Sequence, residues 1–190
     1  WPNGGPKRAW MFRETGVGYS GFAIVGGMLF TMGARDGIES LLAIDAETGA
    51  LLWSADIGPQ VRNAWGDGPR GTPTVSGDNV YAMSGNGFLI CAAKADGKEV
   101  WKARMADFGG RTPGWGYTES VLVDDGKVIC TPGGAKGTLL ALDAKTGSLV
   151  WQSADWTDGA QYSSPVAATI HGTKQYVQLT QQHVSGVDAK

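Results

Sequence analysis

The sequence lacks several features that would point to particular classes of protein. It has only two cysteines, Cys91 and Cys130, in separate apolar segments, which is too few for a disulfide framework and gives no metal-ligand pairing. Its 16 basic and 18 acidic residues give a net charge of −2, which disfavours a nucleic-acid or anionic-membrane partner. No apolar run approaches the ~20 residues needed to cross a bilayer, so no membrane span is predicted.

Motifs for catalysis or metal binding are also scarce. His171 falls in a predicted hairpin turn and His183 near a strand start, and two such distant histidines predict neither a metal site nor a nucleophile–base pair. The segment from Gly16 to Gly21 matches the dinucleotide pattern G-x-G-x-x-G, but a strand follows it where that motif requires a helix. We therefore predict no catalytic residue, no metal ligand and no evident cofactor.

What the sequence does contain is an internal repeat. AIDAETGALLW, from Ala43 to Trp53, recurs as ALDAKTGSLVW, from Ala141 to Trp151. A looser middle copy, CAAKADGKEVW, ends at Trp101, so the tryptophans recur at intervals of about 50 residues, a period typical of repeat architectures. The last residues, GVDAK, are the opening of a fourth copy.

Each position that recurs between the copies of this repeat has a physical explanation. Asp45 and Asp143 precede Thr-Gly, where an aspartate can accept hydrogen bonds from the backbone N–H groups of a turn. The glycine of each copy can take the positive φ that such a turn demands, and these glycines are Gly49, Gly97 and Gly147. The tryptophan that follows offers a large flat face for packing on a neighbouring unit.

A second recurring unit precedes each copy: two apolar strands joined by a two-residue turn. The turn dipeptides are typical of β-hairpins, and they are Gly26-Gly27, Gly77-Asp78, Asp125-Gly126 and His171-Gly172. Each repeat thus supplies four short strands, and no segment has a sustained helical period. Four-stranded units of about 40 to 50 residues indicate the blades of a β-propeller.

We therefore expect an all-β fold, a β-propeller of four-stranded antiparallel blades with about four blade equivalents, which makes it a partial or half propeller. Residues 1–190 form a single region in this interpretation. Its predicted parts are an outer strand at 7–12, blades at 19–54, 70–103 and 117–153, and an incomplete blade at 162–190.

The A-x-D-x-x-T-G-x-x-x-W pattern resembles the tryptophan-docking motif of the pyrroloquinoline-quinone (PQQ) type β-propeller repeat. Quinoprotein alcohol dehydrogenases and the outer-membrane β-barrel assembly lipoproteins share that repeat. The resemblance implies that the repeat tryptophans lock adjacent blades together, a role that falls to Trp10, Trp53, Trp101 and Trp151. It also implies a periplasmic or secreted location.

The same resemblance implies a ring of seven or eight blades, more than this chain supplies. The chain is then the front half of a longer protein, or two copies assemble head to tail, each lending its Trp10 strand to the other. Exposed strand edges at both ends favour some such pairing.

A candidate ligand site follows from the residues that lead into the innermost strands. One register of the four blades holds Tyr19, Arg70, Tyr117 and Tyr162, and Glu119 lies close to it. One interpretation is a polar pocket at the channel mouth, roofed by Trp65 and Trp115, in which Arg70 holds an anion and the tyrosines stack. The other is that these side chains fill the channel and pair with one another, Arg70 with Glu119 included.

Two functions remain open. The favoured one is a non-catalytic binding or scaffolding module, part of a larger propeller, with protein or polysaccharide partners. The alternative is a fragment of a PQQ-dependent alcohol or sugar oxidoreductase, which by resemblance needs PQQ, a calcium site, a catalytic aspartate and usually a vicinal cysteine pair. None of these is recognisable in the sequence.

Overall fold

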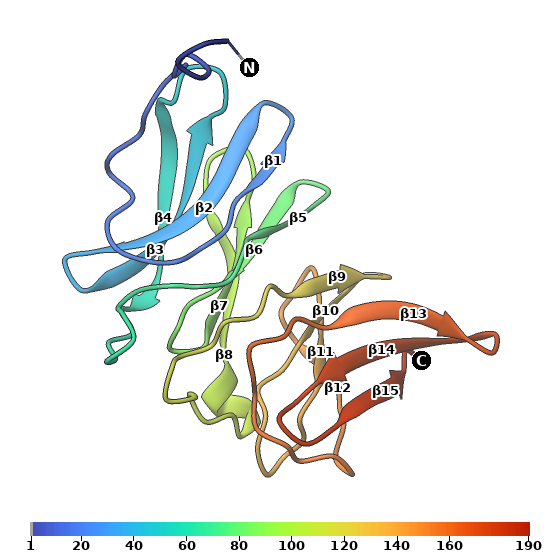
Figure 1. Cartoon of the computed structure of the whole chain (residues 1–190). Helices are drawn as coiled ribbons and strands as arrows, with labels where there is room; N and C mark the ends of the chain where they lie inside the picture. The colour runs from blue at the N-terminus through green and yellow to red at the C-terminus, as the bar shows by residue number, and fades with distance from the viewer. Residues whose placement is uncertain (1) are drawn as a thin grey trace.

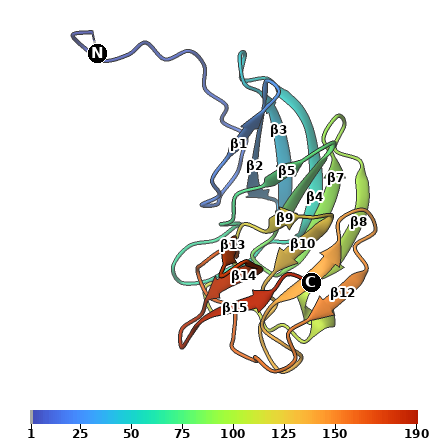
Figure 2. The same cartoon turned by 90° about the vertical axis from the view of Figure 1, so that its right-hand side faces the viewer.

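The computed structural model describes residues 2–190, and the fold over this range is almost entirely β-structure. Four separate antiparallel sheets follow one another along the chain, with the N- and C-termini at opposite ends of the array (Figures 1 and 2). Across residues 2–190 the sheets do not close into a ring. The prediction of an all-β partial propeller is therefore confirmed.

Three of the sheets have four strands in chain order. The first contains β1 Ala23–Val25, β2 Met28–Arg35, β3 Ile38–Asp45 and β4 Leu51–Pro59. The second contains β5 Thr74–Ser76, β6 Asn79–Met83, β7 Phe88–Ala93 and β8 Glu99–Arg104. The third contains β9 Leu122–Asp124, β10 Lys127–Cys130, β11 Leu140–Asp143 and β12 Leu149–Gln152.

The last sheet has three strands, β13 Val166–Ile170, β14 Thr173–Leu179 and β15 Val184–Asp188. One short 3-10 helix, η1 Met105–Phe108, follows β8. No helix over residues 2–190 has the length and apolar character that crossing a membrane would require.

The predicted hairpin turns are confirmed at all four places, since β1–β2, β5–β6, β9–β10 and β13–β14 pair antiparallel across them. At the third turn Asp125 and Gly126 have φ of 46° and 71°, and at the fourth His171 and Gly172 have φ of 49° and 80°. Positive φ at both central residues is the geometry that lets a two-residue turn match the twist of its strands.

The predicted outer strand at 7–12 is not formed. These residues have no strand pairing, and Trp10 instead packs on the first sheet. The reason lies in the topology: the partner expected for this strand is the last sheet, which stands at the other end of the open array.

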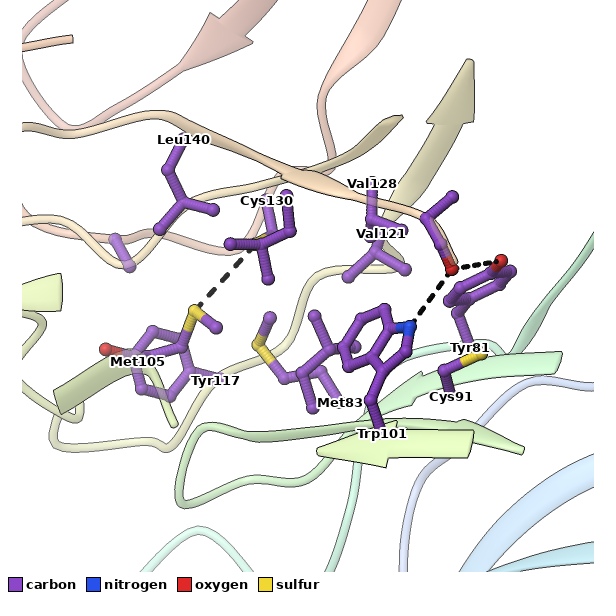
Figure 3. Packing of buried hydrophobic residues seen from close by; sticks show 14 residues of the cluster. Tyr81, Met83, Cys91, Trp101, Met105, Tyr117, Val121, Val128, Cys130 and Leu140 are labelled. Atoms are coloured by element: carbon purple, nitrogen blue, oxygen red, sulfur yellow. Dashed lines mark hydrogen bonds between the residues drawn. The ribbon is translucent and has the colours of Figure 1, made fainter. Parts of the chain in front are cut away.

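The core lies between successive sheets and forms three clusters. The cluster between the first two sheets includes Phe30, Leu41 and Ile90. The largest lies between the second and third sheets and includes Met83, Trp101 and both cysteines, shown in Figure 3. Cys91 and Cys130 are free and fully buried, as expected for packing residues.

Candidate functional site

The innermost strands β1, β5, β9 and β13 bring together the four segments that precede them. Backbone contacts set the register: the Thr72 N–H donates to Ser120 Oγ at 2.9 Å, and the Ser120 N–H donates to Ser164 Oγ at 2.9 Å. Each of these residues stands two positions before its strand, as Gly21 does in the first sheet. Two residues earlier, the side chains of an extended segment point to the same side again. The equivalent residues at that position are Tyr19, Arg70, Thr118 and Tyr162.

The structure thus shifts the third blade by one residue from the register expected from sequence. Thr118 occupies the place predicted for Tyr117. Because successive side chains along extended backbone point to opposite sides, this shift turns both Tyr117 and Glu119 away from the pocket and into the protein. Tyr19, Arg70 and Tyr162 are brought together as expected.

These residues line a pocket of about 320 Å³ at the convergence of the four sheets. Its lining consists of Tyr19, Trp65, Arg70, Trp115, Thr118 and Tyr162. Trp115 and Tyr162 are stacked, with ring centroids 4.7 Å apart and planes inclined by 15°. The two tryptophans expected to roof a pocket do line it, so the site is chiefly a set of aromatic faces.

Arg70 is held in this pocket by its own loop. Its Nη1 and Nη2 donate to the carbonyl oxygens of Gly68 and Gly66, at 2.5 and 2.6 Å. The guanidinium carbon lies 5.4 Å from the centre of the Tyr19 ring, a cation–π arrangement. The expected Arg70–Glu119 ion pair does not form, because Glu119 is turned into the core, where it accepts from Thr131.

Tyr117 lies in the core between the second and third sheets, as Figure 3 shows. Its Oη donates to the Pro132 carbonyl at 2.9 Å, and its ring packs on Gly87. Burial raises the pKa of its hydroxyl, and the nearby Glu119 carboxylate adds to that rise. Tyr117 is placed to brace the third sheet and does not reach the pocket.

Glu119 is also buried, with 3% of its surface exposed. Its Oε1 accepts a hydrogen bond from the Thr131 N–H at 2.7 Å, whereas Oε2 has no partner. Loss of solvation raises its pKa to about 7, against the lowering effect of the bonds to Thr131. A carboxylate that is costly to ionise lies directly behind the pocket-lining Thr118.

A second buried carboxylate, Glu39, was not anticipated from sequence. Its Oε1 accepts from the Val61 N–H at 2.8 Å and its Oε2 from the Gly85 N–H at 2.7 Å, so it ties the first sheet to the second. Burial raises its pKa, and those two N–H groups act in the opposite direction. One feature of the sequence could have identified Glu39: it is the single acidic residue within the apolar strand that leads to Asp45.

Three of the four repeat tryptophans make the same contact. The indole N–H of Trp10, Trp53 and Trp101 donates to the carbonyl of Ala46, Lys94 and Ala144, at 2.9, 3.0 and 3.0 Å. Each indole covers the turn glycine of the next sheet, and these glycines are Gly49, Gly97 and Gly147. Figure 3 shows the Trp101 bond, with Tyr81 Oη donating to the same carbonyl.

Trp151 has the same place in the repeat but not the same bond, because its indole N–H is buried without a partner. It stacks instead on Tyr176 of the last sheet, with ring centroids 6.1 Å apart. The turns that receive the other indoles are built as predicted. Asp45 Oδ1 accepts the Glu47 and Thr48 N–H groups, which lowers its pKa, and Asp143 does the same for Lys145 and Thr146.

A polar cluster on the last sheet also escaped the sequence interpretation. Asp158 Oδ2 accepts from Trp156 Nε1 at 2.9 Å and from Thr180 Oγ1 at 2.6 Å, and His183 Nδ1 lies 2.7 Å away. These contacts, with the Thr180 bond the strongest, lower the pKa of Asp158 to about 2. The cluster holds the loop before β15 in place.

The described residues offer no cluster of carboxylates of the kind that commonly holds calcium. Calcium takes six to eight oxygen ligands, chiefly from carboxylates and carbonyls. Over residues 2–190, no three His, Cys, Asp or Glu side chains lie close enough together to hold a metal ion. The pocket itself is lined by no carboxylate.

Comparison with known proteins identifies one matching family and several similar proteins. The profile of the family described as outer membrane protein assembly factor BamB matches residues 17–190. The chain is 32% identical over 121 residues to quinohemoprotein alcohol dehydrogenase ADH IIB of Pseudomonas putida, covering 59% of this chain and 17% of that protein. It is 28% identical over 140 residues to BamB of Kangiella koreensis, covering 67% of this chain and 30% of that protein.

Among solved structures, BamB from Moraxella catarrhalis superimposes with a TM-score of 0.57 at 22% identity, over 95% of this chain and 49% of that one. This likeness supports the propeller fold alone. The chain spans less than a third of the length of the two relatives above, so their whole activities are not carried over to it.

Proposed function

The chain belongs to the β-propeller family described as outer membrane protein assembly factor BamB, and on that premise we propose that it is a non-catalytic binding or scaffolding module. The observation that carries the proposal is the pocket where four successive sheets meet, lined by the aromatic rings of Tyr19, Trp65, Trp115 and Tyr162. Aromatic clefts with few polar groups are typical of binding sites. Its partners are protein or polysaccharide, and its location is periplasmic or secreted.

The module acts within a larger propeller. Trp10 contacts the first sheet as Trp53 contacts the second, so it occupies the place of the outermost strand of a preceding blade. At the other end, β15 has a free edge, and Val184 on it is 70% exposed. Further blades of a longer chain, or a second copy of this one, complete the array by covering these two ends.

The mass of the chain in solution tests this arrangement. We expect light scattering to give a dimer at micromolar concentration when a second copy closes the array, and Trp10→Ala to return it to monomer. A well-folded monomer that keeps β15 unprotected from hydrogen exchange would contradict closure by a second copy and leave further blades as the partner.

The alternative function, a fragment of a PQQ-dependent alcohol or sugar oxidoreductase, is favoured by the 32% identity to a quinohemoprotein alcohol dehydrogenase. Adding PQQ and calcium to the chain, and to the longest protein that contains it, separates the two functions. We expect neither bound-quinone absorbance nor dye reduction with alcohols or sugars. Turnover that depends on both additions would overturn the binding-module proposal.

A further inference from the structure

Three aromatic rings of the pocket are largely exposed. Trp65 is 71% exposed, and Tyr19 and Tyr162 are each 64% exposed. They lie on different segments, before β5, β1 and β13, and the Trp115–Tyr162 stack joins two of the sheets. Flat rings held on a rigid scaffold bind apolar groups at little cost in side-chain entropy.

Two polar side chains of the pocket are engaged within the chain, whereas the indole N–H of Trp115 is buried without a partner. Arg70 donates to two loop carbonyls, and Thr118 Oγ1 donates to the Gln161 carbonyl at 3.1 Å. No carboxylate lines the pocket to accept from a ligand hydroxyl or amide. A sugar, whose many hydroxyls need partners when they leave water, fits this lining poorly.

A proline residue fits the pocket lining better than a sugar does. A proline residue has an apolar ring and no backbone N–H, so it brings no donor that needs an acceptor. Proline-rich segments form a polyproline II helix before binding and dock onto aromatic-lined grooves. The pocket volume of about 320 Å³ is near the lower end of the ~300–1,000 Å³ range of ligand sites. It suits one turn, ~3 residues, of such a helix.

The positive charge of Arg70 indicates a further property of the partner. Arg70 carries the single charge among the residues that line the pocket, and three of its five donors reach Gly66, Gly68 and Asn63. An acidic residue beside the prolines can pair with the remaining donors.

Resting on the proposed binding function, we infer that the pocket binds a proline-rich, acidic segment of a partner protein. The proline rings lie against Tyr19, Trp65 and the Trp115–Tyr162 stack, and a carboxylate of the segment faces Arg70.

Three synthetic peptides test this inference by calorimetry and tryptophan fluorescence. The first has a run of prolines flanked by glutamates, the second replaces the prolines by alanines, and the third replaces the glutamates by lysines. We expect saturable binding of the first, at least tenfold weaker binding of the second, and severalfold weaker binding of the third. No saturable binding of the first peptide, or equal binding of the first two, would overturn the inference.

Variants of the chain locate the site. Trp65→Ala removes the most exposed ring and should weaken binding of the first peptide at least tenfold without lowering the unfolding temperature. The matched control is Val100→Ala, an exposed apolar residue on β8, which should leave the affinity unchanged. Equal losses in both variants would contradict a site at the pocket.

A soluble oligosaccharide, cellohexaose, serves as the competing probe. Absence of binding agrees with the peptide inference. Binding of cellohexaose that Trp65→Ala abolishes would overturn the inference while leaving the binding-module function intact. That function fails separately, through quinone-dependent turnover.

Discussion

The interface between the second and third sheets and the interface between the third and last sheets are built from the same repeat but differ in completeness. At the first, Trp101 is 7% exposed, its N–H bonds to Ala144, and its ring covers Gly147. At the second, Trp151 has no hydrogen-bond partner and the buried cluster is the smallest of the three. The residue type is the same, so the tryptophan alone does not make the interface.

The buried carboxylates show a similar contrast. Glu39, which joins the first two sheets, has a backbone N–H on each oxygen, whereas Glu119, which precedes β9 of the third sheet, has one oxygen unpaired. A buried polar atom without a partner costs about 1–3 kcal/mol. The complete interfaces are therefore expected to hold more of the stability than the end that carries β15.

The largest expected effect comes from removing the indoles in turn. Trp101→Ala should lower the free energy of unfolding by about 3–5 kcal/mol, the usual range for a buried tryptophan. Trp151→Ala should cost about 1–3 kcal/mol, because part of the ring is exposed and no hydrogen bond is lost. Urea denaturation of both variants measures the difference.

Equal losses in the two variants would contradict the contrast between the interfaces. If Trp101→Ala does not fold, the milder pair Trp101→Phe and Trp151→Phe gives the same ranking. The phenylalanine at 101 loses the bond to Ala144, and the phenylalanine at 151 loses none.

The next effect is a change in pH dependence. The pKa of folded Glu119 is raised to about 7 from its ordinary 4.5, so the folded chain binds the proton more tightly than the unfolded chain. Stability should then fall as pH rises from about 4.5 to about 7. Glu119→Gln should flatten this slope and raise the free energy of unfolding at pH 8 by about 1–3 kcal/mol.

Glu39→Gln is the matched control for that measurement. Both oxygens of Glu39 accept backbone N–H groups, so an amide nitrogen would face a donor and destabilise the fold by about 1–3 kcal/mol. Unchanged pH dependence in Glu119→Gln would show that its ionisation does not oppose folding.

The smallest effect distinguishes a turn that receives an indole from one that does not. Gly147 and Gly126 have nearly equal φ, 72° and 71°, but a Cβ would lie 2.7 Å from Trp101 Cδ2 at Gly147 and would meet nothing within 4 Å at Gly126. Each alanine costs about 1 kcal/mol for the backbone alone. Gly147→Ala should cost about 1 kcal/mol more, because the indole must move. Equal melting temperatures would show that the indole adapts freely.

The sequence was sufficient to predict the repeating sheets, because turn chemistry and alternation are local. Asp125-Gly126 and the Asp143 turn could be located from adjacent residues, and both form as expected. The strand at 7–12 could not be judged in this way, since its pairing depends on whether a distant sheet is present. Its sequence is compatible with a strand, but the open array offers it no partner.

The pocket was predicted only in part for a related reason. Tyr19, Arg70 and Tyr162 line one pocket, but Tyr117, the residue that the sequence pattern aligns with them, does not. A single-residue shift exchanges the two sides of an extended segment, and only the bonds from Thr72 to Ser120 and from Ser120 to Ser164 reveal it. Glu39 was missed because its partners are backbone N–H groups, which leave no trace in the sequence.

The indoles of Trp10, Trp53 and Trp101 all donate to a main-chain carbonyl, so the side chain of the accepting residue is free to vary, and it is alanine twice and lysine once. A unit of this kind is compatible with any neighbour that offers the same backbone turn. Such units can be duplicated, deleted or exchanged between genes without redesigning their junctions, which gives propellers of this construction a simple route to change in circumference during evolution.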